Sequence, residues 1–315
     1  SSLDLITLIT DDKIMENFVL IALFVGLGML FRKLEAFPDQ TAQVLNMFAL
    51  YVALPAVILL KVPQLSFSAT MIVPALVPWA MLAFSAVLVL LAGRRFGWSR
   101  PTIGVLLLVV PIGNTSFMGV PMVQAFFGEA GIPFLIIYDQ VGTMLIFALY
   151  GSTILAMYGR EGSVNALEVA KRALTFPPTM ALLVGLALRS WPYPMALVKG
   201  LQTLAGMLTP LVMTAIGFQL RIRLSPAVLK PLSYGLAIKL AIAPVVALLG
   251  CRFLGLTDLA ANVSIFEAGM PPMVTAGALA IAAGMVPELA AALVSLGMAL
   301  AFVTLPLLYL LLTVL

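Results

Sequence analysis

Three ionisable residues, Asp139, Lys239 and Glu267, stand inside long apolar segments of the chain. Charged side chains are costly and rare inside a membrane, and they usually face the protein interior or a water-filled cavity. At ~1.5 Å of rise per residue, each would lie about 10 to 13 Å from the nearer end of its segment. These three residues are therefore the first candidates for a functional site.

Two stretches rich in proline and glycine interrupt apolar segments of the same kind. The first reads VVPIGNTSFMGVP at 109–121, and the second reads FEAGMPPMV at 266–274. Proline removes a backbone N–H and clashes with the carbonyl one turn back, so each stretch predicts a broken helix. A non-helical stretch is tolerated inside a membrane only where protein or a water-filled cavity surrounds it. A pair of simple proline kinks is the alternative interpretation.

The second half of each broken helix should begin near Pro121 and Pro272, because proline suits the first helical position. Its free N–H groups and positive dipole end would attract an anion. Unwound carbonyl groups could instead bind a cation, but the pattern favours an anionic substrate. The residues assigned to substrate binding are Asn114, Thr115, Phe117, Gly119, Pro121, Gln124, Met270, Pro271 and Pro272.

Each of the polar candidates has a structural alternative. Asn114 could satisfy the helix break instead of binding substrate, and Asp139, in IIYDQVGT, could hydrogen-bond that break. Lys239 could form a structural ion pair with Glu267 or Asp139, or it could attract an anionic substrate. Glu267 directly precedes the second break and is the first choice for coupling to a proton, because the chain has no histidine.

The composition places the chain in a lipid bilayer. It is 63% hydrophobic and 10% charged over 315 residues, whereas a soluble domain is about half apolar and a quarter charged. A single cysteine and no histidine exclude an internal disulfide, Ser-His triads and cysteine or histidine metal sites. We expect no metal and no cofactor, apart from possible coupling to H⁺ or Na⁺.

Basic residues lie in short loops rather than on one face, so nucleic acid is not an expected partner.

Apolar runs of roughly 20 residues predict membrane spans. There are ten of them, so we predict an all-α polytopic membrane protein of ten transmembrane helices with short loops. The predicted spans are 15–34, 41–60, 70–92, 101–127, 132–157, 173–190, 195–219, 230–253, 259–283 and 288–313.

Basic loop residues predict the orientation, because they concentrate on the cytoplasmic side. Eleven lie on one side of the predicted spans and five on the other. Both termini should then face outward, in a plasma membrane or bacterial inner membrane. The eleven predicted cytoplasmic residues are Arg32, Lys33, Arg94, Arg95, Arg100, Arg160, Lys171, Arg172, Arg221, Arg223 and Lys230.

Motifs recur in order along the chain at an offset of 151 to 157 residues. LPAVILL matches TPLVMTA, GRRFG matches GCRFL, and PMVQA matches PMVTA. We therefore predict a first five-helix repeat over 1–158, a central cytoplasmic loop over 159–172 and a second repeat over 173–315. An odd number of spans per repeat inverts the second, with helices 4 and 9 as the broken pair. Inverted repeats with broken helices are typical of secondary transporters.

The segments PIGNTSFMGVPMV, FGEAGIPFLIIYD and FEAGMPPMVTAGALA, with PELAAALVS, resemble the auxin efflux carrier family. That family includes the plant PIN carriers and bacterial carriers of malonate and other carboxylates. The resemblance implies a scaffold and a transport domain with crossed helices 4 and 9, a fold shared with bile-acid sodium symporters. Transport by an elevator motion is implied as well, and so is a homodimer through a scaffold built on spans 1, 2, 6 and 7.

The resemblance also implies roles for particular residues. The asparagine of the family's first motif lies at the crossover and meets the substrate carboxylate, and that position is Asn114. The prolines at the crossings would be Pro121 and either Pro271 or Pro272. FEAGM is similar to the glutamate-bearing span 9 of bile-acid symporters, but here PPM replaces the polar residues that follow it there.

The predicted function is secondary transport of a small organic anion by alternating access. The alternatives are a sodium-coupled symporter of the bile-acid type and a non-coupled channel or sensor. Polarity is concentrated at two breaks rather than along a continuous lining, which argues against a channel. An intramembrane enzyme is not expected, because paired aspartates, a GxSxG–His arrangement and metal ligands are missing from the sequence.

Overall fold

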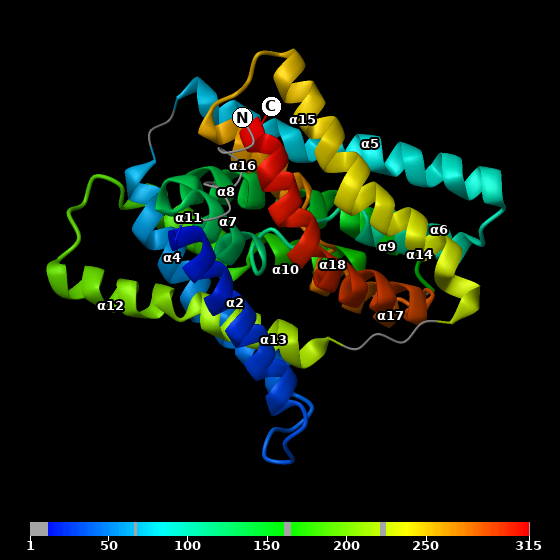
Figure 1. Ribbon diagram of the computed structural model, residues 1–315, viewed down its shortest axis with the longest axis horizontal. Helices are drawn as coiled ribbons and strands as arrows, with labels where there is room; N and C mark the ends of the chain where they lie inside the picture. Colours follow the sequence, from blue (N-terminus) through cyan, green and yellow to red (C-terminus); the bar gives the residue numbers. More distant parts are fainter. Residues whose placement is uncertain (1–11, 66–67, 161–164, 221–224, 315) are drawn as a thin grey trace. The chain divides into compact units, whose positions relative to one another are not determined.

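The computed structural model describes residues 12–65, 68–160, 165–220 and 225–314. In these ranges the regular structure is helical, apart from one isolated antiparallel bridge (Figure 1). The all-α prediction is confirmed for this part of the chain. The predictions for Arg221, Arg223, the start of the chain and residues 161–164 of the central loop fall outside it.

Among the described residues, six helical segments are long and apolar enough to cross a membrane, and each coincides with a predicted span. The other four predicted intervals hold shorter helices, and for these the membrane crossing stays a prediction. The six segments are Thr41–Lys61, Ala69–Phe96, Glu129–Tyr158, Met195–Gln219, Pro226–Phe253 and Pro287–Val314.

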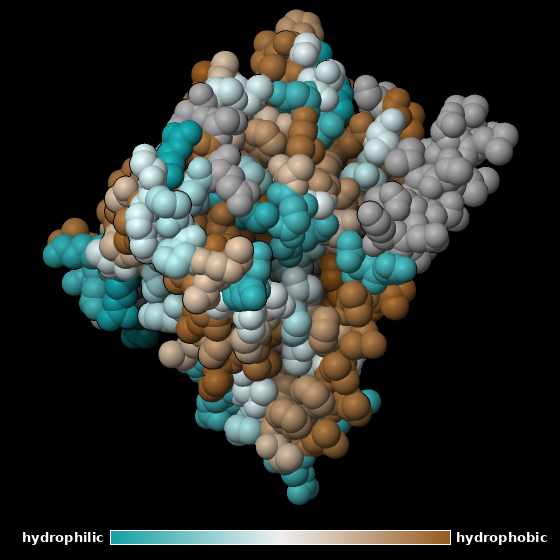
Figure 2. Space-filling model, turned by 90° about the vertical axis from the view of Figure 1, so that its left-hand side faces the viewer, coloured by the Kyte–Doolittle hydropathy of each residue, from teal (hydrophilic) through white to brown (hydrophobic). Residues whose placement is uncertain are grey.

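Large apolar side chains lie exposed on the surface, as expected where lipid replaces water. Phe253 is 91% exposed, and Leu254 and Met195 are each 70% exposed. Figure 2 shows broad hydrophobic areas on the face in view rather than isolated spots. Soluble proteins rarely expose contiguous apolar patches of this kind, so the surface agrees with a bilayer environment.

The chain divides into two compact units, each assembled from three stretches of sequence. Unit 1 comprises Ser1–Phe67, Ser116–Ile136 and Phe176–Leu220, and unit 2 comprises Ser68–Thr115, Ile137–Thr175 and Arg221–Leu315. The helices of unit 1 are α2 (Asp12–Phe31), α3 (Thr41–Phe48), α4 (Leu54–Lys61), α7 (Gly119–Phe127), α8 (Ile132–Ile137, ending in unit 2), α11 (Pro177–Ala187), α12 (Met195–Gly206) and α13 (Leu208–Gln219).

Two glycines bring α2 and α13 of unit 1 into backbone contact. A Cβ atom at Gly28 would lie 2.0 Å from the carbonyl oxygen of Thr214. A Cβ atom at Gly217 would lie 2.0 Å from the carbonyl oxygen of Val25. No side chain fits at either position, so these glycines set the crossing of the blue and yellow-green helices in Figure 1.

Unit 2 contains the longest helices and three π-helical turns. Its helices are α5 (Ile72–Phe96), α6 (Arg100–Val109), α9 (Ser152–Tyr158), α10 (Ala166–Leu174), α14 (Leu229–Ala237), α15 (Ala243–Phe253), α16 (Leu259–Ala268), α17 (Val274–Ala282) and α18 (Pro287–Val314). The π-helical turns are η5 (Tyr138–Met144), η6 (Phe147–Gly151) and η8 (Ile238–Ile242). Helix α5 contacts η5, η8, α15 and α16.

Helix α5 fits closely against η5 because Gly142 has no side chain. A Cβ atom there would lie 2.2 Å from Cγ of Pro78. The indole N–H of Trp79 donates to the carbonyl oxygen of Val141 at 3.2 Å. These contacts fix the part of unit 2 that carries Asp139.

Both predicted helix breaks are present. Helix α6 ends at Val109 and α7 begins at Gly119, while α16 ends at Ala268 and α17 begins at Val274. The second halves begin near the predicted prolines, since Pro121 is the third residue of α7 and Pro272 lies two positions before the start of α17. The described part of the predicted central loop includes most of α10, whose N-cap Asn165 accepts hydrogen bonds from two backbone N–H groups.

Candidate functional site

The two interrupted segments meet inside unit 2 as a short antiparallel pair. The bridge joins Gly113 to Pro272. The N–H of Asn114 donates to the carbonyl of Pro271 at 2.7 Å, and the N–H of Met273 donates to the carbonyl of Ile112 at 3.0 Å. The unwound backbones therefore satisfy one another, as a helix break in an apolar interior requires. We call residues 112–115 and 268–273 the crossing.

Lys239 and α18 lie against the crossing, and glycines leave the space for both. A Cβ atom at Gly113 would lie 3.2 Å from Nζ of Lys239. A Cβ atom at Gly297, on α18, would lie 2.6 Å from Cδ of Pro272. The contact at Gly297 therefore requires glycine, whereas a Cβ atom at position 113 would need only a small shift of the Lys239 side chain.

Asp139 binds the first break, as one interpretation of the sequence predicts. The hydroxyl of Thr115 donates to Oδ1 of Asp139 at 2.5 Å. The side-chain amide of Gln140 donates to Oδ2 of the same carboxylate at 2.6 Å. All three side chains are buried. Donors on both oxygens stabilise a carboxylate that would be costly to bury alone.

Lys239 makes a different contact from the predicted ion pair with Glu267. Its ammonium group donates to the carbonyl oxygen of Ala268 at 3.2 Å, and in the described ranges no ion pair joins it to Glu267. Ala268 is the last residue of α16. The last carbonyls of a helix lack helical donors and carry its negative dipole end, so a cation is stabilised there.

Two buried polar side chains, one in the crossing and one directly before it, lack full hydrogen bonding. Nδ2 of Asn114 and both carboxyl oxygens of Glu267 have no hydrogen-bond partner among the described residues. Asn114 is 3% exposed and Glu267 is 0% exposed. A buried polar group that lacks a hydrogen bond lowers the free energy of unfolding by about 1–3 kcal/mol, and a charged group lowers it by more. Each such group in a native protein calls for an explanation, and a bound ligand, ion or water is one of them.

Met270 lies in the loop that directly follows α16, the helix that carries Glu267. Its side chain is fully buried, and its N–H donates to the carbonyl of Glu267 at 3.1 Å. The structure thus brings together within unit 2 most of the predicted binding residues and all three predicted intramembrane charges. They are Asn114, Thr115, Met270, Pro271 and Pro272, with Asp139, Lys239 and Glu267.

The remaining predicted binding residues belong to unit 1. Phe117, Gly119 and Pro121 are buried there. The amide of Gln124 donates to Oε1 of Glu129 at 3.1 Å, and Oε2 of Glu129 lies 2.6 Å from Nζ of Lys61. Gln124 therefore has a protein partner, unlike the amide nitrogen of Asn114.

The known proteins that this chain resembles are described as transporters. A family described as Membrane transport protein matches residues 13–309. An uncharacterized transporter of Methanothermobacter thermautotrophicus is 27% identical over 295 residues, which cover 93% of this chain and 96% of that protein. The uncharacterized transporter MJ1031 of Methanocaldococcus jannaschii is 26% identical over 274 residues, which cover 82% and 85%.

The chain belongs to this family, the auxin efflux carriers. The resemblance inferred from the motifs is confirmed, and the match extends over nearly the whole chain. The protein is accordingly a membrane transporter, and the crossing is its candidate substrate site.

Several contacts in this auxin efflux carrier were missed by sequence reasoning. Asp139 and Lys239 both lie in π-helical turns, η5 and η8, and such turns are frequent at functional sites. Gln140 was not singled out, although its place beside Asp139 in an apolar run was a usable signal. The π-helical turns leave no comparable trace, because they add one residue to a turn without a fixed residue type.

Thr115→Val is expected to destabilise the transporter by about 1–3 kcal/mol, because it removes the hydroxyl donor to a buried carboxylate without changing side-chain shape much. The measurement is thermal unfolding of the purified protein. Thr153→Val is the matched control, since its hydroxyl donates to the carbonyl of Leu149 at 2.7 Å on an exposed part of α9. Equal shifts in the two variants would contradict a special role for the Thr115–Asp139 contact.

Proposed function

We propose that this transporter is a secondary carrier of small organic anions, and that carboxylates or dicarboxylates such as malonate are its substrates. The observation that carries the proposal is the buried amide nitrogen of Asn114, which has no hydrogen-bond partner among the described residues and lies at the meeting point of two broken helices. An amide N–H is a donor only, so it suits a carboxylate oxygen.

The surrounding charges support an anion over a cation. Nζ of Lys239 lies beside Gly113, the residue preceding Asn114. An ammonium group within the crossing attracts a carboxylate and repels a cation. Asp139 already has donors on both oxygens, so its charge is the more strongly compensated of the two acids.

Glu267 supplies the coupling step in this proposal. It is fully buried, its carboxyl oxygens have no partner, and it lies within electrostatic range of Asp139 and Lys239. An anionic substrate would be repelled by Glu267 as a carboxylate and accepted once a proton is bound. Substrate and proton would therefore cross together.

We assign the transport domain to unit 2 and the scaffold to unit 1, with alternating access by an elevator motion and a homodimer through the scaffold. Two observations support the assignment. The crossing lies wholly within unit 2. Unit 1 contains α2, α3 with α4, α11, and α12 with α13, which are the segments that the family resemblance assigned to the scaffold core.

Sodium coupling is the second candidate, because the free carboxyl oxygens of Glu267 are also suitable ligands for a hard cation. It differs from the first in one testable respect. Sodium would need further oxygen ligands beside the ammonium group of Lys239, whereas a proton binds a single carboxyl oxygen of Glu267.

Thermal unfolding in the presence of a carboxylate panel tests the proposed substrate class. A ligand that binds the folded protein at 100 times its dissociation constant stabilises it by about 2.7 kcal/mol. We expect at least one small mono- or dicarboxylate to raise the unfolding temperature by several degrees, and the matching amide to have no effect. Stabilisation that requires sodium would favour the second candidate. Stabilisation by cations or neutral solutes alone would refute the anion assignment.

A further inference from the structure

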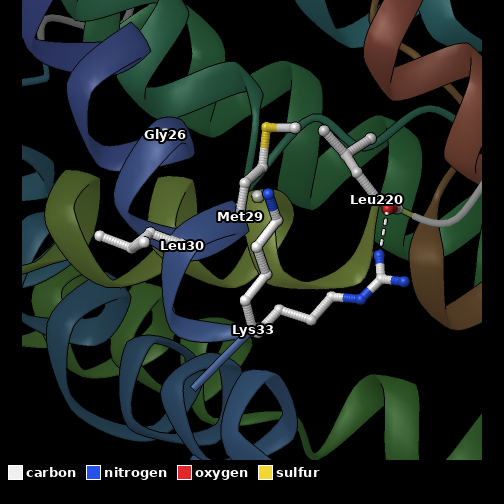
Figure 3. A pocket seen from close by; sticks show the side chains of 7 residues that line it. Gly26, Met29, Leu30, Lys33 and Leu220 are labelled. Atoms are coloured by element: carbon white, nitrogen blue, oxygen red, sulfur yellow. Dashed lines mark hydrogen bonds between the residues drawn. The ribbon is translucent and has the colours of Figure 1, made fainter.

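A hollow of about 510 Å³ opens on unit 1 beside the contact between α2 and α13 (Figure 3). It involves none of the residues assigned to transport. Its lining residues are Gly26, Met29, Leu30, Arg32, Lys33, Gly217 and Leu220.

Glycine creates the floor of the hollow. A Cβ atom at Gly26 would have no neighbour within 4 Å, so the helix surface is open there. Gly217 instead lies in backbone contact with α2, which holds the two helices together at the base. Met29 and Leu30 are each half exposed and supply apolar walls.

Two cations stand at the mouth of the hollow. Nη1 of Arg32 donates to the carbonyl oxygen of Leu220, the C-cap of α13, at 2.6 Å, as the dashed line in Figure 3 marks. This contact fixes the guanidinium group and leaves its other donors available. Figure 3 shows the side chain of Lys33 extending beside Met29, and no hydrogen bond or ion pair of its ammonium group is recorded in the described ranges.

An apolar stripe leads away from the hollow along α2. Val19, Leu23, Gly26 and Leu30 recur at helical spacing, and the three large side chains are 50% to 55% exposed. Residues three or four positions apart lie on one face of a helix. The mouth is therefore cationic, and a continuous apolar surface extends from it along the membrane-spanning direction of α2.

We propose that this hollow binds an anionic phospholipid. Its phosphate contacts Arg32 and Lys33, and an acyl chain lies over Gly26 along the stripe. Basic pockets at the membrane-facing ends of helices suit lipid phosphates. The apolar stripe favours a lipid over a free phosphate ion, which would leave Leu30 and Met29 exposed. The same basic end is the one predicted to face the cytoplasm.

Native mass spectrometry and thermal unfolding of the purified full-length protein test the proposal. Phosphatidylglycerol is expected to remain bound and to raise the unfolding temperature by several degrees, while phosphatidylcholine and inorganic phosphate have no such effect. Lys33→Gln should raise the half-saturating phosphatidylglycerol concentration about five-fold, because one basic contact is lost. Lys199→Gln, an exposed lysine of α12 in the same unit, is the matched control.

Gly26→Trp provides a second test that does not alter charge. A Cβ atom at position 26 meets no neighbour within 4 Å, so the variant should still fold. The indole ring would fill the hollow, so phosphatidylglycerol binding should fall at least five-fold. Equal binding of phosphatidylcholine, stabilisation by inorganic phosphate alone, or unchanged binding in both variants would overturn the proposal. A change in oligomeric mass of the lipid-free protein with Gly26→Trp would identify a second copy of the chain as the occupant instead. None of these outcomes depends on the proposed transport substrate.

Discussion

Asn114→Ala is expected to reduce substrate uptake about ten- to one-hundred-fold while leaving the folded protein intact. The amide nitrogen has no protein partner, so its removal breaks no hydrogen bond of the described structure. A hydrogen bond to a charged group contributes about 1.5–3 kcal/mol, which corresponds to roughly ten- to one-hundred-fold in affinity. The measurement is uptake of the stabilising carboxylate into proteoliposomes, with its half-saturating concentration.

Two further variants make the Asn114 experiment specific. Asn114→Asp keeps the shape and replaces a donor by a negative charge, so uptake of an anion should fall below that of the alanine variant. Asn165→Ser is the matched control, because serine preserves the N-cap of α10 in the same unit. Wild-type uptake and unchanged half-saturation in Asn114→Ala would refute the assignment of this residue to the substrate.

The breaks and their partners were largely predictable from the sequence. Pro111, Pro271 and Pro272 cannot supply backbone donors, so together with the neighbouring glycines they favour a break in each helix. Two such segments at matching positions of a repeat then predicted one shared site, and the Asn114–Pro271 hydrogen bond joins them. The contact of Asp139 with the first break was also predictable from the sequence. A buried carboxylate needs hydrogen-bond donors, and an unwound segment provides them.

The sequence did not reveal which acid Lys239 would approach. Opposite charges predicted an ion pair with Glu267 or Asp139, but the ammonium group binds the carbonyl of Ala268 at the end of α16. That outcome depends on the position of the helix end at Ala268, one residue after Glu267. Helix ends are uncertain by one or two residues even in structures, and here a shift of that size decides whether a carbonyl or a carboxylate receives the cation.

The close approach of α2 and α13 was equally hidden. Gly28 and Gly217 are separated by nearly two hundred residues, and glycine is frequent in membrane helices in general. Only the backbone distances in the folded chain distinguish these glycines from Gly26, which has open space beside it. Composition identifies a helix that can pack closely, but the partner and the contact position come from tertiary structure.

Glu267→Gln is expected to lower proton-driven accumulation of substrate at least ten-fold, while exchange of substrate across the membrane continues. Glutamine has nearly the shape of a protonated glutamate, so the neutral state that admits an anion is kept. It cannot release the proton, so the gradient can no longer drive transport. The measurement is accumulation in proteoliposomes with and without an inward proton gradient, compared with counterflow at equal pH.

Control variants and ion gradients separate the coupling schemes. Glu288→Gln changes an exposed acid in the first turn of α18, within the same unit, and should preserve the gradient response. Proton-driven accumulation that persists in Glu267→Gln would exclude this carboxyl as the coupling group. Wild-type accumulation driven by sodium, and lost in the same variant, would assign Glu267 to a cation instead. Since Glu267 is fully buried and neither carboxyl oxygen has a partner among the described residues, one of these ions is expected to neutralise it during the transport cycle.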